Sequence, residues 1–203
     1  MNTRKREESL TLEILEAIEQ RDNVTQRHLA DRMGVALGLA NSYMKRCVRK
    51  GLIKVHQAPA NRFLYYLTPK GFAEKSRLTA SYLSSSFDFY RRAGDSLAEV
   101  FSLCEAQNKT SVLLCGVSEL AEIASIRAHA HEIEIIGVFD PYSKKENLLH
   151  LQVWHSLDDV DGYDACLITS LEEAVSIVKL LRQQIREDDI LIPSILGIST
   201  NND

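Results

Sequence analysis

One predicted helix, residues 36–50, carries amide, hydroxyl and cationic side chains together with apolar ones. Helical periodicity turns four apolar side chains inward, those of Ala40, Met44, Cys47 and Val48. The outward positions are then Leu37, Gly38, Asn41, Ser42, Lys45 and Arg46. An Asn amide can pair with adenine, a Ser hydroxyl reaches a base or a phosphate, and the cations pair with phosphates. This combination predicts contact with DNA, although each side chain taken singly also suits a solvated surface.

Two further helices and a turn are predicted to hold this surface in place. Residues 9–20 place apolar side chains at helical spacing, and Thr25 is a suitable N-cap for a second helix. Gly34 allows a tight turn before the third helix, which ends at Gly51. The order of these elements is typical of a helix-turn-helix, whose third helix enters the major groove.

A β-hairpin is predicted directly after the third helix. Two apolar runs, 52–56 and 63–67, flank a polar tip at 57–62. Residues 1–69 are therefore expected to form a winged helix-turn-helix, an α+β DNA-binding domain. Arg62 at the hairpin tip is predicted to enter the minor groove or to lie along the backbone. The rest of the predicted DNA-binding set, beyond the outward positions above, is Thr25, Gln26, Arg27 and Arg49.

Charge is divided unevenly along the chain. Residues 1–80 carry 15 Lys and Arg against 8 Asp and Glu, whereas residues 81–203 carry 9 against 20. A basic part joined to an acidic part favours a polyanionic partner for the first part alone, although chance clustering would give the same counts.

Several local motifs resemble those of a known family. Residues 25–53 resemble a winged helix of the MarR type. The exopolysaccharide-associated MarR-family regulators are the most similar, through Thr25-Gln26-Arg27, Gly34-Val35-Ala36-Leu37-Gly38, Lys50-Gly51, Leu67-Thr68-Pro69-Lys70-Gly71 and Glu74-Lys75-Ser76-Arg77-Leu78-Thr79. The resemblance extends over about residues 8–92. It implies a homodimeric bacterial regulator of polysaccharide or sugar-related genes. Ala36 departs from the family, where a capping Ser is usual, and the hairpin tip is shorter.

A long helical linker is predicted over residues 70–108. Its apolar and small residues alternate at spacings of three and four, which is the pattern of a dimerisation seam. The seam consists of Ala73, Ser76, Ala80, Leu83, Phe87, Tyr90, Gly94, Leu97, Phe101 and Cys104. Two ordinary amphipathic helices packed within one chain, with a break at Gly94 and a restart capped by Ser96, would have the same spacing.

Residues 109–203 alternate strand and helix patterns, which predicts a small Rossmann-like α/β domain with a mainly parallel sheet. Gly116, Val117, Ser118 and Glu119 follow a strand and open a helix, where dinucleotide-binding loops hold a pyrophosphate. Asp140 stands where an acidic residue could hold a ribose hydroxyl. Because only the first glycine of that motif is present, a nucleotide or nucleotide-sugar site, a smaller ligand and a plain structural unit all remain open.

Other chemistry finds little support in the sequence. No Ser/His/Asp or Cys/His arrangement suggests a catalytic site, so no enzyme is predicted. His129 and His131 are two residues apart, a spacing that is poor for chelation on a helix, and no metal site is predicted. The four cysteines are far apart and suggest free thiols. The absence of a long apolar run or a signal segment predicts a cytoplasmic protein without a membrane partner.

The sequence thus favours a dimeric, sequence-specific transcription regulator that binds double-stranded DNA. Its acidic domain is expected to sense a small-molecule effector, with no cofactor assigned. Two alternatives stay open: a protein-interaction or oligomerisation module that does not bind DNA, and a nucleotide-binding enzyme with a regulatory arm.

Overall fold

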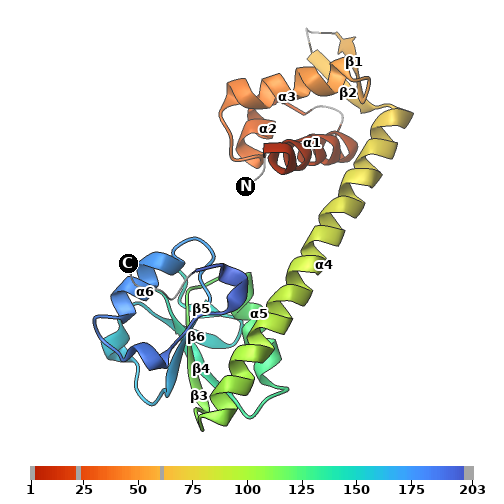
Figure 1. Ribbon diagram of the computed structural model, residues 1–203. Helices are drawn as coiled ribbons and strands as arrows, with labels where there is room; N and C mark the ends of the chain where they lie inside the picture. The colour runs from red at the N-terminus through yellow and green to blue at the C-terminus, as the bar shows by residue number, and fades with distance from the viewer. Residues whose placement is uncertain (1–2, 22–23, 60–61, 199–203) are drawn as a thin grey trace. The chain divides into compact units, whose positions relative to one another are not determined.

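The chain forms two compact units, Met1–Phe87 and Asp88–Asp203. The computed structural model describes residues 3–21, 24–59 and 62–198 (Figure 1). Within these ranges, no helix combines the length and apolar character needed to cross a membrane.

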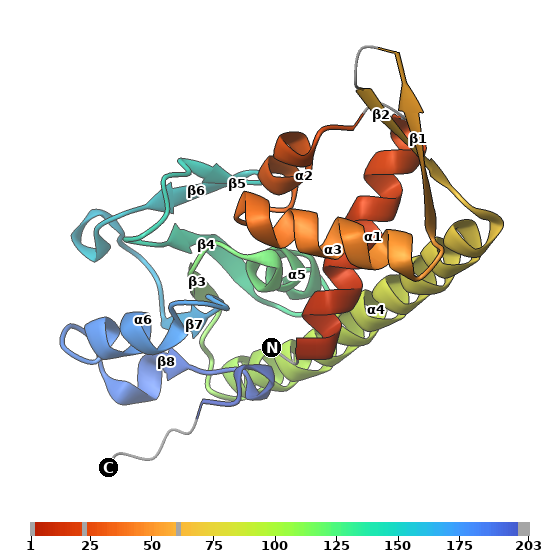
Figure 2. The ribbon, with the colours of Figure 1, turned by 90° about the horizontal axis from the view of Figure 1, so that it is seen from above.

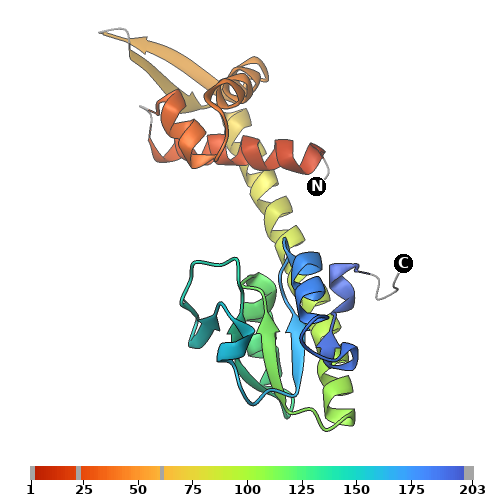
Figure 3. The same cartoon turned by 90° about the vertical axis from the view of Figure 1, so that its left-hand side faces the viewer.

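Three helices and a hairpin make up most of the first unit. Its elements are α1 (Thr3–Gln20), α2 (Gln26–Arg32), α3 (Leu37–Arg49), β1 (Ile53–Ala58), β2 (Arg62–Leu67) and the start of α4 (Pro69–Ala106). The two strands pair antiparallel, with Ile53 opposite Leu67, and the hairpin projects beyond the three helices (Figure 3). This arrangement is the winged helix-turn-helix that the sequence predicts.

The helices of the first unit are held by one apolar core. Ile14 and Leu15 of α1 and Leu29 of α2 are fully buried, and Ala40 and Met44 of α3 join the same cluster. Burying a side chain of this size stabilises a fold by about 1.5–3 kcal/mol, so this core fixes which face of α3 is turned inward.

The passage from the hairpin into α4 is a compact turn. The Thr68 hydroxyl donates to the carbonyl oxygen of Gly51 at 2.6 Å and accepts the amide of Gly71 at 3.0 Å. A Cβ atom on Gly71 would lie 2.1 Å from the carbonyl oxygen of Leu52. The close approach of two backbones therefore requires glycine here, which gives the Leu-Thr-Pro-Lys-Gly segment a structural reason.

The second unit is a six-stranded sheet with helices on both faces. Besides the end of α4 it contains β3 (Ser111–Cys115), α5 (Glu119–Ala128), β4 (Glu134–Phe139), β5 (Asn147–Leu148), β6 (Leu151–Trp154), β7 (Ala165–Ile168), α6 (Ala174–Leu181) and β8 (Ile190–Leu191). Single 3-10 turns lie at Leu157–Asp159, Glu187–Asp189 and Ser194–Leu196.

The strands follow the order β5-β6-β4-β3-β7-β8, and all pairs are parallel except β5 with β6. Residues of α4 and α5 share one buried cluster with Val112 and Leu114, whereas α6 packs with Leu113 and Cys115 on the opposite face (Figure 2). The mainly parallel α/β sheet is confirmed. The sequence did not indicate the short strands β5 and β6.

Helix α4 is continuous, as predicted for the long linker, which rules out the alternative of two helices with a break at Gly94. The Ser96 hydroxyl does not cap a restart. It contacts the Ser194 hydroxyl at 3.0 Å and accepts the amide of Ile195. The boundary between the two units falls at Phe87, inside the helix predicted as a linker over 70–108.

The residues of the predicted seam along α4 are buried in one part of the helix and exposed in another. Leu97, Phe101 and Cys104 are fully buried in the core of the second unit, so for them the dimer-seam prediction is wrong. Leu83 and Phe87 are exposed. The spacing could not distinguish the two, because any helix with one buried face repeats at intervals of three and four residues.

Gly71→Ala is expected to destabilise the protein, because the new methyl group would collide with the backbone of Leu52. The expected loss of unfolding free energy is about 1–3 kcal/mol, the range for overpacking, measured by chemical denaturation. Gly38→Ala is the matched control, since no atom lies within 4 Å of its added Cβ. Equal stability of Gly71→Ala and the wild type would contradict this account of the turn.

Candidate functional sites

The outward face of α3 is centred on four exposed residues. The buried residues Ala40, Met44 and Cys47 define the inward direction. At 3.6 residues per turn, the opposite direction is occupied by Gly38, Ser42, Lys45 and Arg49, all of which are exposed. This face therefore carries the hydroxyl of Ser42 and the cations of Lys45 and Arg49. The sequence predicts the outward direction of Gly38, Ser42 and Lys45, and Arg49 joins them in the structure.

Asn41 and Arg46 lie at the two edges of this face rather than at its centre. Both are only half-exposed, and the Oδ1 atom of Asn41 is buried without a hydrogen-bond partner among the described residues. The Arg46 guanidinium lies 3.0 Å from the Glu7 carboxylate of α1. That hydrogen bond lowers the pKa of Glu7 and raises the pKa of Arg46. The sequence-based picture of both side chains projecting freely outward is thus wrong, because a step of about 100° per residue turns them toward the neighbouring helices.

Two other expectations about α3 need correction. Val48 does not face inward, since 36% of it is exposed. Leu39, which the sequence analysis did not single out, is 39% exposed next to Leu37, which is 48% exposed. A helical wheel centred on the small and apolar residues Ala40, Met44 and Cys47 would have revealed both positions.

The start of α2 has the predicted form. The Thr25 hydroxyl caps the helix by accepting the amide of His28 at 3.1 Å, and Gly34 forms the following turn with a φ of 58°. Arg27 is exposed and Gln26 is half-buried. Arg62 begins β2, but its side chain lies outside the described residues.

Several exposed cations of this unit have no ion-pair partner among the described residues, and Arg27, Lys45 and Arg49 of α2 and α3 are among them. Elsewhere in the unit, Arg32 pairs with Glu16, Lys75 with Glu19 and Arg77 with Glu74. Cations that remain free of internal carboxylates are available to phosphate oxygens, which gives the face of α3 and the start of α2 an affinity for a polyanion.

A crevice of about 310 Å³ opens at the carboxyl ends of the parallel strands in the second unit. Loops after β3, β4 and β7 line it, with Val117, Ser118, Glu119 and Asp140 among the lining residues. The chain leaves β3 toward α5 on one face and leaves β7 toward α6 on the other. Ligands of open parallel sheets bind where the connections diverge in this way.

Several hydrogen-bonding groups of this crevice are already used by the protein itself. Asp140 is buried, and its carboxylate accepts the amides of Val117 at 2.8 Å, Tyr142 at 2.9 Å and Ser143 at 3.0 Å. The Ser118 hydroxyl caps α5 by accepting the amides of Leu120 and Ala121. Asp140 therefore holds the loops together and does not offer a free carboxylate to a ribose.

Gly116 is required by packing. It has a φ of 112°, and a Cβ atom there would lie 2.3 Å from the Cβ of Ser170. The loop after β3 thus touches the loop after β7, which explains the glycine without a bound pyrophosphate. The described lining also includes Glu119, Glu172 and Glu173 but no Lys or Arg, so its charge disfavours a phosphate ligand.

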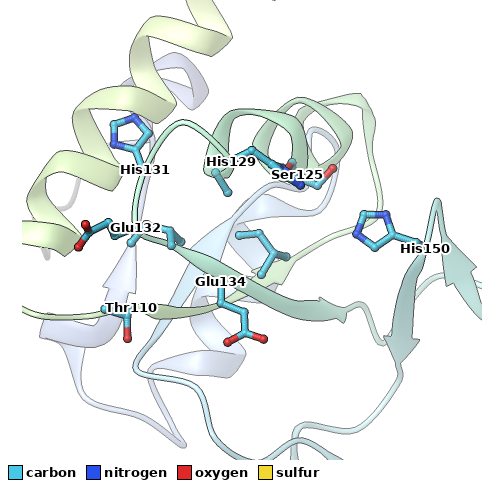
Figure 4. Close-up of a pocket in the computed structure, with 10 residues that line it drawn as sticks. Thr110, Ser125, His129, His131, Glu132, Glu134 and His150 are labelled. Carbon is cyan, nitrogen blue, oxygen red and sulfur yellow. The ribbon is translucent and has the colours of Figure 1, made fainter.

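A second, wider hollow of about 590 Å³ lies near the amino ends of β3 and β4 (Figure 4). Three histidines line it, His129, His131 and His150, but His131 lies beside α4 and far from His150 in Figure 4. The Nδ1 atom of His131 is 3.2 Å from the Glu105 carboxylate. Within the described ranges no three His, Cys, Asp or Glu side chains are grouped to hold a metal ion.

Comparison with known proteins agrees with the geometry of the first unit. Residues 8–54 match the family model described as winged helix-turn-helix DNA-binding. No curated protein matches the chain. Residues 8–54 of the first unit thus match a winged helix-turn-helix in sequence as well as in fold.

Similar solved structures include three regulators. MepR, a transcription regulator of the Staphylococcus aureus multidrug efflux pump MepA, is 23% identical over 41% of this chain and 61% of its own, with a TM-score of 0.35. The PcaV transcriptional regulator from Streptomyces coelicolor is 24% identical over 43% and 76%, with a TM-score of 0.32. ZitR, a zinc-responsive MarR family member from Lactococcus lactis, is 22% identical over 44% and 60%, with a TM-score of 0.34. This chain spans about three fifths of the MepR and ZitR chains.

Asp140→Ala is expected to destabilise the second unit, because three backbone amides would lose their acceptor. A buried donor left unsatisfied costs about 1–3 kcal/mol, so the unfolding free energy should fall by at least that amount. Thermal unfolding followed by circular dichroism measures the change, and Asp158→Ala, at an exposed aspartate of the same unit, serves as the control. A variant as stable as the wild type would mean that the carboxylate is free to bind a ligand after all.

Proposed function

We propose that this protein is a sequence-specific, DNA-binding transcription regulator. The observation that carries the proposal is the exposed row Gly38, Ser42, Lys45 and Arg49 on α3, within the segment that matches a winged helix-turn-helix. In such a domain this helix enters the major groove, where Ser42 would contact bases. Lys45 and Arg49, free of internal carboxylates, would contact phosphates on either side.

The remaining predicted contacts have supporting roles. Thr25 caps α2 and Gln26 and Arg27 open it, and the exposed Arg27 cation favours a backbone phosphate. Arg46 is held by Glu7 at the edge of α3 and contributes to the same phosphate attraction. Asn41 would pair with adenine only after its buried Oδ1 turns outward. The base edge would then provide the hydrogen bond that this oxygen lacks in the folded chain.

We further propose that the protein acts as a homodimer through the first unit. Tyr82, Leu83 and Phe87 of α4 are exposed, and 58% of Phe87 faces solvent. A groove beside them is lined by Leu12 of α1 and Leu78 of α4. Burying this surface against a second copy would remove it from water and place two α3 helices on the two half-sites of a palindrome.

The second unit is proposed to be a Rossmann-like effector domain. Its crevice lies where small molecules bind in this architecture, and the sequence leaves a nucleotide, a nucleotide-sugar, a smaller ligand or no ligand open. The acidic lining and the occupied amides favour a neutral or cationic small molecule instead. Control of polysaccharide or sugar-related genes follows from the family resemblance of residues 8–92.

DNA binding is tested by selection of sites from random duplexes, followed by fluorescence anisotropy on the selected duplex. Lys45→Ala and Arg49→Ala are each expected to weaken binding to all duplexes and to reduce the slope of log affinity against log salt by about 1. Lys179→Ala, at an exposed lysine of the second unit, should leave affinity and slope unchanged. Failure to bind any duplex would reject the regulator and favour the protein-interaction module.

Dimerisation is tested by analytical ultracentrifugation of the full chain, whose monomer mass is 22.9 kDa. Phe87→Glu is expected to shift the protein from dimer to monomer, because a charge would enter the apolar contact. Leu103→Glu is the matched control, since Leu103 is 49% exposed on the same helix but outside the predicted seam. A wild-type protein that sediments as a monomer at high concentration would contradict the proposed dimer.

A further inference from the structure

The first turn of α3 contains a glycine that the folded chain does not require. Gly38 lies in a regular helix without a positive φ, and no atom lies within 4 Å of a Cβ built on it. Alanine is more stable than glycine in a helix by about 1 kcal/mol. In contrast, a Cβ on Gly71, Gly116 or Gly137 would meet an atom within 2.5 Å. A helical glycine with open space in front of it is explained when another molecule must approach its backbone closely.

The residues beside this glycine are apolar and uncovered. Leu37 is 48% exposed and Leu39 is 39% exposed, whereas their neighbour Ala40 is buried. No charged residue stands between Ala36 and Ala40, and the free cations Lys45 and Arg49 follow on later turns of the same helix. The first turn of α3 thus exposes apolar side chains on either side of Gly38, and the two cations follow on later turns.

The major groove of B-DNA has a complementary distribution. Its walls carry phosphates, and its floor carries one apolar group, the C5 methyl of thymine, which aliphatic side chains contact. An apolar first turn that enters the groove ahead of two cations would bring Leu37 and Leu39 to the floor, while Lys45 and Arg49 remain near the phosphates. This combination of cations and a glycine with open space in front of it suits DNA better than a protein partner, which has no regular row of phosphates.

We propose that the first turn of α3, Leu37-Gly38-Leu39, recognises thymine methyl groups, and that Gly38 allows the helix backbone to approach the base edges. The inference rests on the proposed function and adds a base preference to it. It states that α3 selects duplexes with thymines at the positions that its first turn contacts. Hydrogen bonds from Ser42 then act beside an apolar contact.

The direct test removes the methyl groups without changing base pairing. Each thymine of the selected duplex is replaced in turn by uracil, and affinity is measured by fluorescence anisotropy. Burial of one methyl group corresponds to about a fourfold change in affinity, so one or two positions should weaken by that factor in the wild type. The same replacements should have no effect on Leu37→Ala or Leu39→Ala at the position that each side chain contacts. Leu103→Ala, at an equally exposed leucine of α4, should respond like the wild type.

Gly38→Ala provides an independent measurement. The variant is expected to unfold at a higher denaturant concentration than the wild type and yet to bind the selected duplex about tenfold more weakly, because the added methyl group holds the helix away from the bases. Loss of affinity in a more stable protein cannot come from misfolding.

The outcomes separate the two proposals. A protein that binds no duplex overturns both the regulator and this inference. A protein that binds its selected duplex but tolerates uracil at every position overturns the inference alone. Unchanged affinity of Gly38→Ala likewise overturns the close approach of the helix backbone.

Discussion

The burial of one side of α3 is the constraint on which the candidate interface depends. Ala40, Met44 and Cys47 pack into the core formed with α1 and α2, so the helix cannot rotate about its axis without exposing them. The helical repeat then determines which side chains are presented to solvent. Packing that contacts no ligand therefore decides that Ser42 and Lys45 are at the centre of the face and that Asn41 and Arg46 are at its edges.

Burial of apolar side chains also gives α4 two different roles along one row of residues. Near its end, Leu97 and Phe101 cover the sheet of the second unit, whereas Leu83 and Phe87 have no covering group within the described part of the chain. An apolar row on a helix indicates that the row is buried, but it does not indicate which element or molecule packs against it. In this chain the cover changes from the chain's own sheet to the proposed second copy near the boundary of the two units.

The crevice of the second unit illustrates how a fold can use its own groups where related architectures hold a ligand. The Asp140 carboxylate accepts the Val117 amide, and the Ser118 hydroxyl accepts the amides of Leu120 and Ala121 in the first turn of α5. Amides that are already hydrogen-bonded within the protein have little affinity left for an anion. Any effector of this unit must gain its binding energy from the acidic and apolar groups that remain at the rim.

The sequence by itself determined the order of elements, the winged helix-turn-helix and the mainly parallel sheet, because periodicity, Gly34, Gly51 and the hairpin pattern are local signals. It also located most residues of the candidate interface on one helix. Only the tertiary structure decided that Arg46 pairs with Glu7, that Asp140 binds backbone amides and that Leu97 packs inside the chain. Each of these contacts joins residues distant in sequence or from different elements, and a local pattern carries no information about its partner.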